Sequence, residues 1–188
     1  MAASNSKVSS GVNLTSDFFL KNFYKYNRNA VKTTTRNDYT KTELSYEDSR
    51  ALKRAIAKLK DFSYSEDENK NNIISTISAF TRTYNNVIES TSSQDSNTYR
   101  QNRQLKALTD KYGDELKDIG ISIEKDGTLS ISDNILKGAS LKKIRKVFSE
   151  DSNYVNDTRK IARRMNATSY DEVYAQITGA GGKLNIVL

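Results

Sequence analysis

One stretch, residues 121–131, constrains the fold more than any other part of the sequence. It places Asp126-Gly127 between two short runs in which aliphatic residues alternate with polar ones. The central residues of a two-residue hairpin turn need positive φ, which Gly adopts freely and Asp tolerates. The stretch therefore predicts a β-hairpin, and helices must cover its apolar face because an isolated hairpin is only marginally stable. The predicted apolar face comprises Ile121, Ile123, Leu129 and Ile131.

The rest of the sequence is dominated by apolar residues at helical spacing. Ser45 and Asp48 resemble a capping box at the start of one segment, and Gly120 is expected to end another. The segments 73–88 and 105–119 have similar length and a short polar connector, so they are expected to pair antiparallel. The predicted helices cover 45–60, 73–88, 105–119, 141–148, 153–165 and 169–177, with a short one around 135–136.

These patterns predict a mainly α fold: a helical bundle with a central antiparallel helix pair and one β-hairpin (about 121–131) packed on it. The length of 188 residues fits one domain. We expect a disordered N-terminus at 1–11, a single helical domain with the hairpin at 12–178, and a Gly-rich joint with a candidate terminal strand at 179–188. Residues expected in the core are Ile77, Phe80, Tyr84, Leu108, Tyr112, Leu116, Ile121 and Leu129.

The composition removes most catalytic and metal-binding arrangements. The sequence has no Cys, His, Trp or Pro, which excludes thiol nucleophiles, imidazole bases, disulfides and the usual zinc ligands. The consecutive carboxylates of 66–68 point in different directions on a helix and do not form an acid/base pair. Glu124, Asp126 and Asp133 lack the spacing of a calcium loop, and a turn and a helix cap explain the two aspartates. We therefore expect no enzyme activity, no cofactor and no metal.

The formal net charge of +7 is not concentrated in one part of the sequence. Residues 1–60 carry 12 basic and 5 acidic side chains, residues 61–136 carry 8 and 13, and residues 137–188 carry 10 and 5. Attraction of phosphate needs such cations on one face. Binding of nucleic acid or acidic surfaces is therefore kept as an alternative function. The residues that would serve it are Lys53, Arg54, Lys142, Lys143, Arg145, Lys146, Arg163 and Arg164.

Two apolar segments are candidates for partner contacts. Residues 14–26 are rich in aromatic side chains and form either a packing helix or a surface that a partner covers. The last residues read as an apolar strand whose edge could pair with another chain, including a second copy. The partner-binding residues expected from these segments are Phe18, Phe19, Phe23, Leu184, Ile186 and Leu188.

No stretch approaches the roughly 20 apolar residues of a membrane span. The N-terminus also lacks the apolar run of a cleavable signal peptide. We therefore expect no membrane span, and a location in the cytoplasm or export by a route that needs no signal peptide.

The order of the motifs resembles a known family. The Phe-x-x-x-Tyr-Asn-x-x-Ile pattern of 80–88 resembles a helix of bacterial flagellar filament-capping proteins, the hook-associated family. In that family a second helix ends in a Gly-Ile step, here Gly120-Ile121, and an Asp-Gly hairpin, a short helix, a Phe-bearing helix and a further helix follow. The resemblance covers about residues 73–166. It implies a scaffold domain without the sheet-rich outer domains and long terminal heptad helices of the family.

Together, these observations predict a non-enzymatic structural or assembly protein that acts through protein–protein contacts. The resemblance implies a link to the bacterial flagellum. Binding of nucleic acid or acidic surfaces remains the alternative.

Overall fold

The computed structural model describes residues 36, 39–65 and 69–178. The contacts of the chain separate a compact unit, Lys41–Val173, from a second unit made of residues 1–40 and 174–188. The mainly α fold class with one hairpin is confirmed, whereas the predicted domain boundaries stay predictions. In chain order the described elements are α2 (Lys41–Lys60), α3 (Lys70–Ser90), α4 (Tyr99–Lys111), α5 (Gly113–Lys117), β1 (Ile121–Ile123), β2 (Leu129–Ile131), α6 (Asp133–Gly138), α7 (Leu141–Phe148) and α8 (Asn153–Thr178).

Helix α2 begins four residues before its predicted start. Ser45 and Asp48 therefore lie inside the helix and are buried, and the predicted capping box is wrong. The Ser45 hydroxyl instead shares a hydrogen bond of 2.6 Å with the hydroxyl of Ser169 in α8. These short side chains let the two helices approach each other. The predicted apolar stripe of α2 is confirmed, with Leu52, Ile56 and Leu59 fully buried.

Helix α3 follows its predicted apolar spacing. It begins after Asn69, whose side-chain oxygen accepts a hydrogen bond of 3.0 Å from the backbone N–H of Asn71 and so caps the first turn. The seam residues Ile73, Ile77, Phe80, Tyr84 and Val87 are fully buried. Along this seam α3 packs closely on α2, a pairing that the sequence patterns did not predict.

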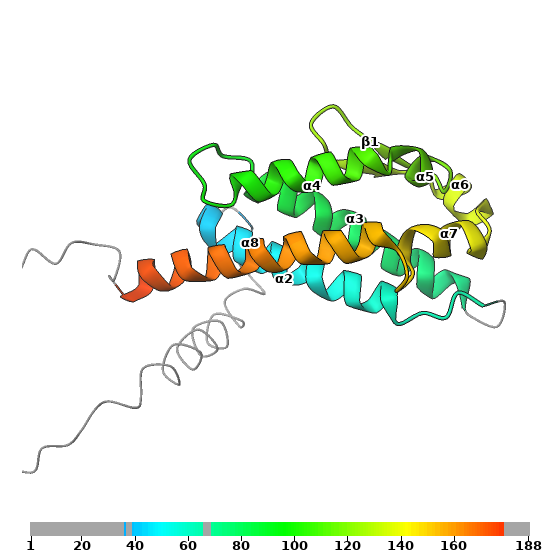
Figure 1. Cartoon of the computed structure of the whole chain (residues 1–188), viewed down its shortest axis with the longest axis horizontal. Helices are drawn as coiled ribbons and strands as arrows, with labels where there is room; N and C mark the ends of the chain where they lie inside the picture. Colours follow the sequence, from blue (N-terminus) through cyan, green and yellow to red (C-terminus); the bar gives the residue numbers. More distant parts are fainter. Residues whose placement is uncertain (1–35, 37–38, 66–68, 179–188) are drawn as a thin grey trace, which may run out of the picture. The chain divides into compact units, whose positions relative to one another are not determined.

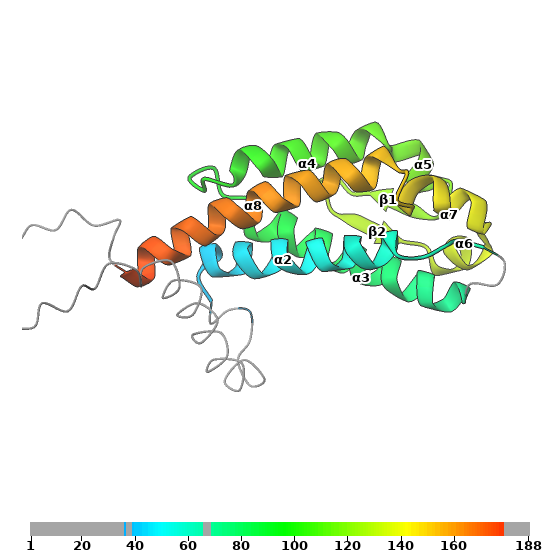
Figure 2. The same ribbon diagram turned by 60° about the horizontal axis from the view of Figure 1, so that its bottom comes forward.

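Four helices form the bundle (Figures 1 and 2). Helices α2, α3, α4 and α8 lie along one another, and each runs opposite to the one before it. The expected antiparallel arrangement of α3 and α4 is therefore present. It is fixed by Asn102 of α4, whose amide donates to the backbone oxygen of Ile88 at 2.9 Å and to the Thr91 hydroxyl at 2.8 Å.

Two predicted helix boundaries are wrong. The helix expected over 105–119 is interrupted at Tyr112, so that α4 and α5 replace one continuous helix. The two helices expected at 153–165 and 169–177 form the single helix α8, because 166–168 contains no residue that breaks a helix. The predicted stop at Gly120 is confirmed. This residue has φ +86°, and a Cβ there would lie 2.8 Å from the Cβ of Ile135.

The hairpin forms where the sequence predicts it, but its turn differs. Ile121 pairs with Ile131, and Ile123 with Leu129. The backbone N–H of Glu124 donates to the oxygen of Thr128 at 2.8 Å, which leaves a three-residue loop with Gly127 at φ +85°. The two-residue turn is therefore wrong. Asp126 keeps the turn role expected of it, since its carboxylate accepts hydrogen bonds from the backbone N–H and the hydroxyl of Thr128.

The core contains most of the residues expected there. Ile77, Phe80, Tyr84, Leu116, Ile121 and Leu129 are buried, whereas Leu108 and Tyr112 are partly buried at the edge of the core. An aromatic cluster at the centre joins three segments: the Phe80 ring centroid lies 5.3 Å from that of Phe148 and 6.3 Å from that of Tyr154. None of the helices within the described ranges is long and apolar enough to cross a membrane.

The side-chain amide of Asn85 fastens the hairpin to α3. Its Nδ2 donates to the backbone oxygen of Leu129 at 2.8 Å, and its Oδ1 accepts from the backbone N–H of Leu129 at 2.8 Å. Replacing Asn85 by alanine leaves both backbone groups without their partner. We expect a loss of about 2 kcal/mol in the free energy of unfolding, measured by urea denaturation. Faster hydrogen exchange of the Leu129 amide should accompany it.

Asn86→Ala is the matched control. It changes a neighbouring half-buried Asn on the same helix and should shift stability by less than about 0.5 kcal/mol. Equal losses in the two variants would show that the Asn85 amide does not hold the hairpin.

Candidate functional site

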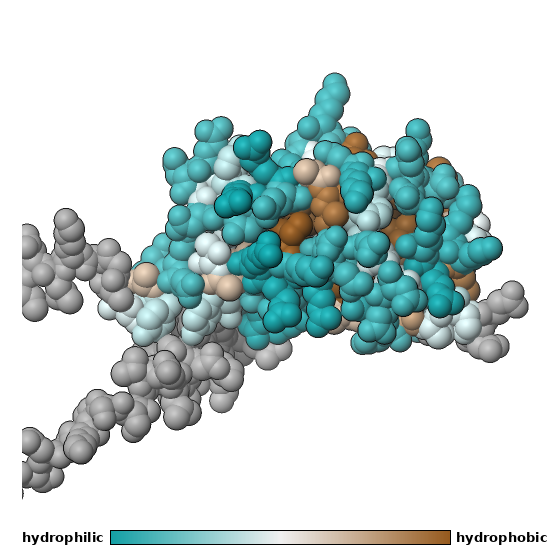
Figure 3. Space-filling model, viewed as in Figure 1, coloured by the Kyte–Doolittle hydropathy of each residue, from teal (hydrophilic) through white to brown (hydrophobic). Residues whose placement is uncertain are grey.

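The apolar partner-binding residues expected from the sequence cannot be placed. Phe18, Phe19, Phe23, Leu184, Ile186 and Leu188 all lie outside the described residues, so their role stays a prediction. In the part that the structure describes, the exposed large hydrophobic residue is Ile135, with 53% of its surface exposed. Figure 3 shows a face that is mostly hydrophilic, with small apolar areas between polar side chains. The described surface therefore offers charge rather than an extended apolar patch.

The cations of α7 are largely neutralised within the fold. Lys143 lies 3.8 Å from the carboxylate of Asp118, and Lys146 lies 3.7 Å from that of Glu115 in α5. Arg145 lies 3.9 Å from the carboxylate of Asp151. These pairs are largely exposed, so each adds little to stability. They nevertheless reduce the positive field over α7, where half of the predicted basic residues lie.

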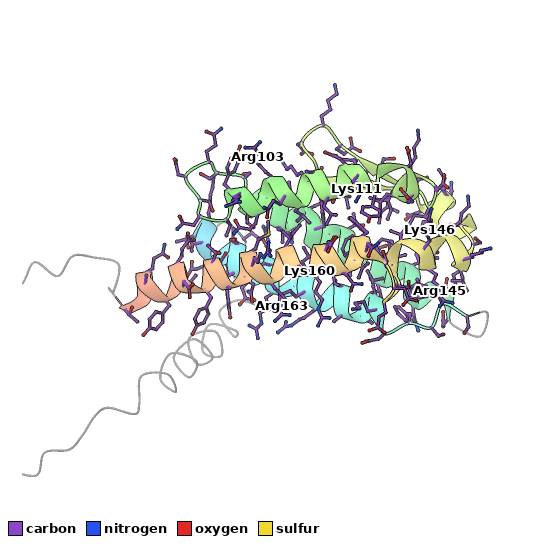
Figure 4. All side chains as sticks on the ribbon, in the orientation of Figure 1. Arg103, Lys111, Arg145, Lys146, Lys160 and Arg163 are labelled. Atoms are coloured by element: carbon purple, nitrogen blue, oxygen red, sulfur yellow. The ribbon has the colours of Figure 1, made fainter. Side chains whose placement is uncertain are left out.

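Cations of α2 and α8 come near one another where a hydrogen bond of 2.9 Å joins Lys53 of α2 to Asn166 of α8. Among the predicted residues, Arg54 follows Lys53 and Arg163 lies one turn before Asn166, and the positive charges of both act on Lys53. Arg50 and Arg159, which the sequence reading missed, belong to the same group. We call these five residues the α2–α8 cation cluster. Figure 4 shows Arg163 on α8 well apart from Arg145 and Lys146 on α7, so the predicted basic set does not form one surface.

Three contacts hold α2 and α8 together in this region. The Lys53 ammonium donates to Asn166 Oδ1 at 2.9 Å, and Asn166 Nδ2 donates to the backbone oxygen of Tyr46 at 3.1 Å. Towards the end of α2, Lys60 donates to Asn156 Oδ1 at 2.9 Å. Lys53 is thus tied to a neutral amide, which positions its charge without cancelling it.

The surroundings of Lys53 change the pKa of its ammonium group. Its pKa is lowered, first by partial burial of the ammonium and then by the positive charges of Arg163, Arg50, Arg159 and Arg54. The protonated form is therefore less favourable in the folded chain than in the unfolded one. At neutral pH the charged Lys53 therefore lowers the free energy of unfolding, and a bound anion would offset this loss.

One acidic side chain borders the cluster. Glu47 Oε1 lies 3.6 Å from Arg50 Nη1, one turn apart on α2. Burial raises the pKa of the Glu47 carboxyl, and the positive charges of Arg50 and Arg54 offset part of this rise. Arg54, Arg159 and Arg163 form no ion pair within the described residues. Within the described residues, Arg50 is therefore the member of the cluster that forms an ion pair.

Arg164 and Lys142 complete the predicted basic set. Both are exposed, and neither belongs to the α2–α8 cation cluster. The sequence held a signal for the missed residues, since Arg50 precedes Arg54 by four positions and Arg159 precedes Arg163 by four, which puts each pair on one helix face. The proximity of α2 to α8 required the tertiary structure.

The described residues contain no group of three carboxylates, histidines or cysteines that could hold a metal ion. Glu66, Asp67 and Glu68 lie outside the described residues. The chain matches no family model, no curated protein and no solved structure. A function for it is therefore proposed from its own residues and their arrangement.

Proposed function

We propose that the chain is a non-enzymatic structural or assembly protein, similar to the scaffold domain of flagellar filament-capping proteins, that acts through protein–protein contacts. The observation that carries this proposal is that the residues of the resemblance meet in one core. Phe80 and Tyr84 of α3 pack with Phe148 of α7 and Tyr154 of α8. The motifs thus belong to one packed unit rather than to unrelated parts of the sequence.

The hairpin supports the same proposal. The Tyr-Asn pair of the α3 motif has a separate role for each residue: Tyr84 enters the core, and Asn85 bonds the backbone of Leu129 in β2. Two motifs that are distant in sequence are therefore joined by direct hydrogen bonds. A structural scaffold needs such fixed joints more than it needs a reactive group.

Self-association tests the proposal. The solution mass of the full chain, measured by light scattering across a range of salt, is expected to exceed that of a monomer and to survive high salt. A chain that ends before Gly179 is expected to form smaller species, because the sequence pattern predicts a terminal strand after that residue whose edge would pair with a second copy.

A matched pair of variants locates the contact within the tail. Replacing Leu184, Ile186 and Leu188 by serine should dissociate the oligomer. Replacing the alternate residues Lys183 and Asn185 by serine should not. Monomers in the full chain and in every variant would remove self-assembly as the function.

A second candidate is binding to nucleic acid or another acidic surface. The single observation that favours it is the α2–α8 cation cluster, in which Arg50 alone of the five cations forms an ion pair within the described residues. Such binding should weaken steeply as salt is raised, whereas contacts through the apolar tail should not.

A further inference from the structure

We propose that the α2–α8 cation cluster is the docking site for an acidic segment of a protein partner, with three or four carboxylates presented within about one helical turn. This inference rests on the proposed assembly function, because it names the chemistry of one surface through which assembly would proceed. The cluster comprises Arg50, Lys53, Arg54, Arg159 and Arg163.

The dimensions of the cluster set the size of the ligand. Arg50 and Arg54 are one turn apart on α2, and Arg159 and Arg163 are one turn apart on α8, which corresponds to about 6 Å along each helix axis. Carboxylates three or four residues apart on an acidic helix have a similar separation. Arginine forks bind carboxylates through two parallel hydrogen bonds, so Arg54, Arg159 and Arg163 suit this ligand, whereas Arg50 already pairs with Glu47.

The cluster is available for a ligand. Arg54, Arg159 and Arg163 are exposed and have no acidic partner among the residues that the structure describes. Lys53 is positioned by the neutral amide of Asn166 and keeps its charge. The cations of α7 are different, because three of them already form ion pairs with Asp118, Glu115 and Asp151.

Retaining five cations at one site opposes folding. Like charges repel, and the lowered pKa of Lys53 records that repulsion together with partial burial. A fold that only needed a soluble surface would have no use for this concentration of like charge. Binding of carboxylates offsets the repulsion and the desolvation together.

The surroundings favour a protein partner over nucleic acid. A nucleic-acid interface needs an extended positive surface that meets several phosphates, whereas this cluster spans about one turn of each helix. The positive surface does not continue undiminished over α7, because the ion pairs there reduce it. The aromatic pair that α2 and α8 bring together, Tyr46 and Tyr170, packs ring against ring with centroids 6.0 Å apart, so these rings are not free to stack on bases.

The test is fluorescence anisotropy with the full chain and a labelled hexaglutamate peptide at low salt. The double variant Arg54→Met/Arg163→Met should weaken peptide binding by about tenfold or more, because it removes one unpaired charge of the cluster from each helix. Methionine keeps the apolar stem of each side chain, and the loss of repulsion should leave the melting temperature no lower than that of the unchanged chain.

The matched control is Lys143→Met/Lys146→Met, which removes the same net charge from α7. It should change the affinity by less than about twofold, because those cations are already paired. Equal weakening by the two double variants would mean that only net charge matters and would overturn the proposed site. Absence of peptide binding to the unchanged chain would also overturn it.

A twelve-residue oligothymidine distinguishes the other class of ligand. It should bind more weakly than the peptide, and tighter binding that depends on Arg54 and Arg163 would overturn the protein partner in favour of nucleic acid. Failure of the peptide test together with a salt-resistant oligomer in light scattering would remove the docking site alone. Peptide binding by a chain that is monomeric under all conditions would instead uphold the site and remove self-assembly.

Discussion

Above pH 10 the protein is expected to lose about 2.7 kcal/mol of folding free energy for each further pH unit, because two tyrosines are buried in its core. Tyr84 and Tyr154 are both fully buried. Burial raises the pKa of each phenol well above its usual value of 10.0, and for Tyr154 the hydrogen bond of 3.4 Å with the Thr109 hydroxyl offsets only part of the rise. Below pH 10 both phenols are protonated in the folded and unfolded chains, so their contribution is constant.

The sign of the effect follows from proton counting. Above pH 10 the unfolded chain releases two protons that the folded chain retains, so the unfolded state is favoured as pH rises. Each phenol contributes about 1.36 kcal/mol per pH unit, and two give the expected slope. The stability is therefore present below pH 10 and is lost as pH rises towards the raised pKa values.

Urea denaturation at a series of alkaline pH values measures this slope. Tyr84→Phe and Tyr154→Phe should each reduce it by about half, and the double variant should remove the contribution of both residues. The part of the tyrosinate absorbance that is missing in the double variant should appear together with unfolding rather than before it. Early ionisation of both phenols in the folded chain would contradict the prediction.

Tyr84→Phe should also be harmless at neutral pH. The hydroxyl of Tyr84 has no hydrogen-bond partner among the described residues, so phenylalanine removes a buried polar group at no loss of a contact. We expect the free energy of unfolding to stay equal or to rise by up to about 1 kcal/mol.

Phe80→Ala is expected to lower the free energy of unfolding by about 3–5 kcal/mol, which is the largest effect of a single substitution that we predict. Phe80 has no exposed surface, and its ring packs with the rings of Tyr84, Phe148 and Tyr154. Alanine would leave a cavity where α3, α7 and α8 meet. The midpoint of urea denaturation measures the loss, with an unchanged slope as evidence that the fold is retained.

Phe62→Ala is the control for Phe80. Phe62 is only partly buried beside Tyr64, so we expect a loss of about 1–2 kcal/mol. Similar losses at the two positions would show that the aromatic cluster around Phe80 is not the centre of the core.

The hairpin illustrates what local sequence does and does not determine. Its existence and its apolar face followed from alternation around Asp126-Gly127, and Ile121 and Leu129 are indeed buried. The length of its turn was not predicted correctly from that pattern. A two-residue turn at 126–127 would have set Ile123 opposite Ser130 and split the apolar residues between the two faces, because the side-chain period of a strand is two. Burial of one common face selects the three-residue loop instead.

Local sequence likewise predicted the buried face of a helix but not the cation cluster, which depends on tertiary contacts. The buried seam of α3 was readable from spacing alone, whereas the position of α2 against α8 depends on Ser45 meeting Ser169 and Lys53 meeting Asn166. Neither polar pair has a signature that identifies its partner more than 100 residues away. The sequence therefore predicted several of the cations but could not separate the clustered ones on α2 and α8 from the ion-paired ones on α7.

The hydrogen bonds between Asn85 and Leu129 limit the pairing of a further strand with the hairpin. Peptide groups alternate in direction along a strand, so those of Leu129 face away from β1, towards the side where a further strand would add. The carboxamide of Asn85 fills that place as a one-residue substitute for a neighbouring chain. An incoming peptide would have to displace it first. The outer margin of β2 is thereby closed to templated pairing at its first residue, which disfavours growth by strand addition along this edge.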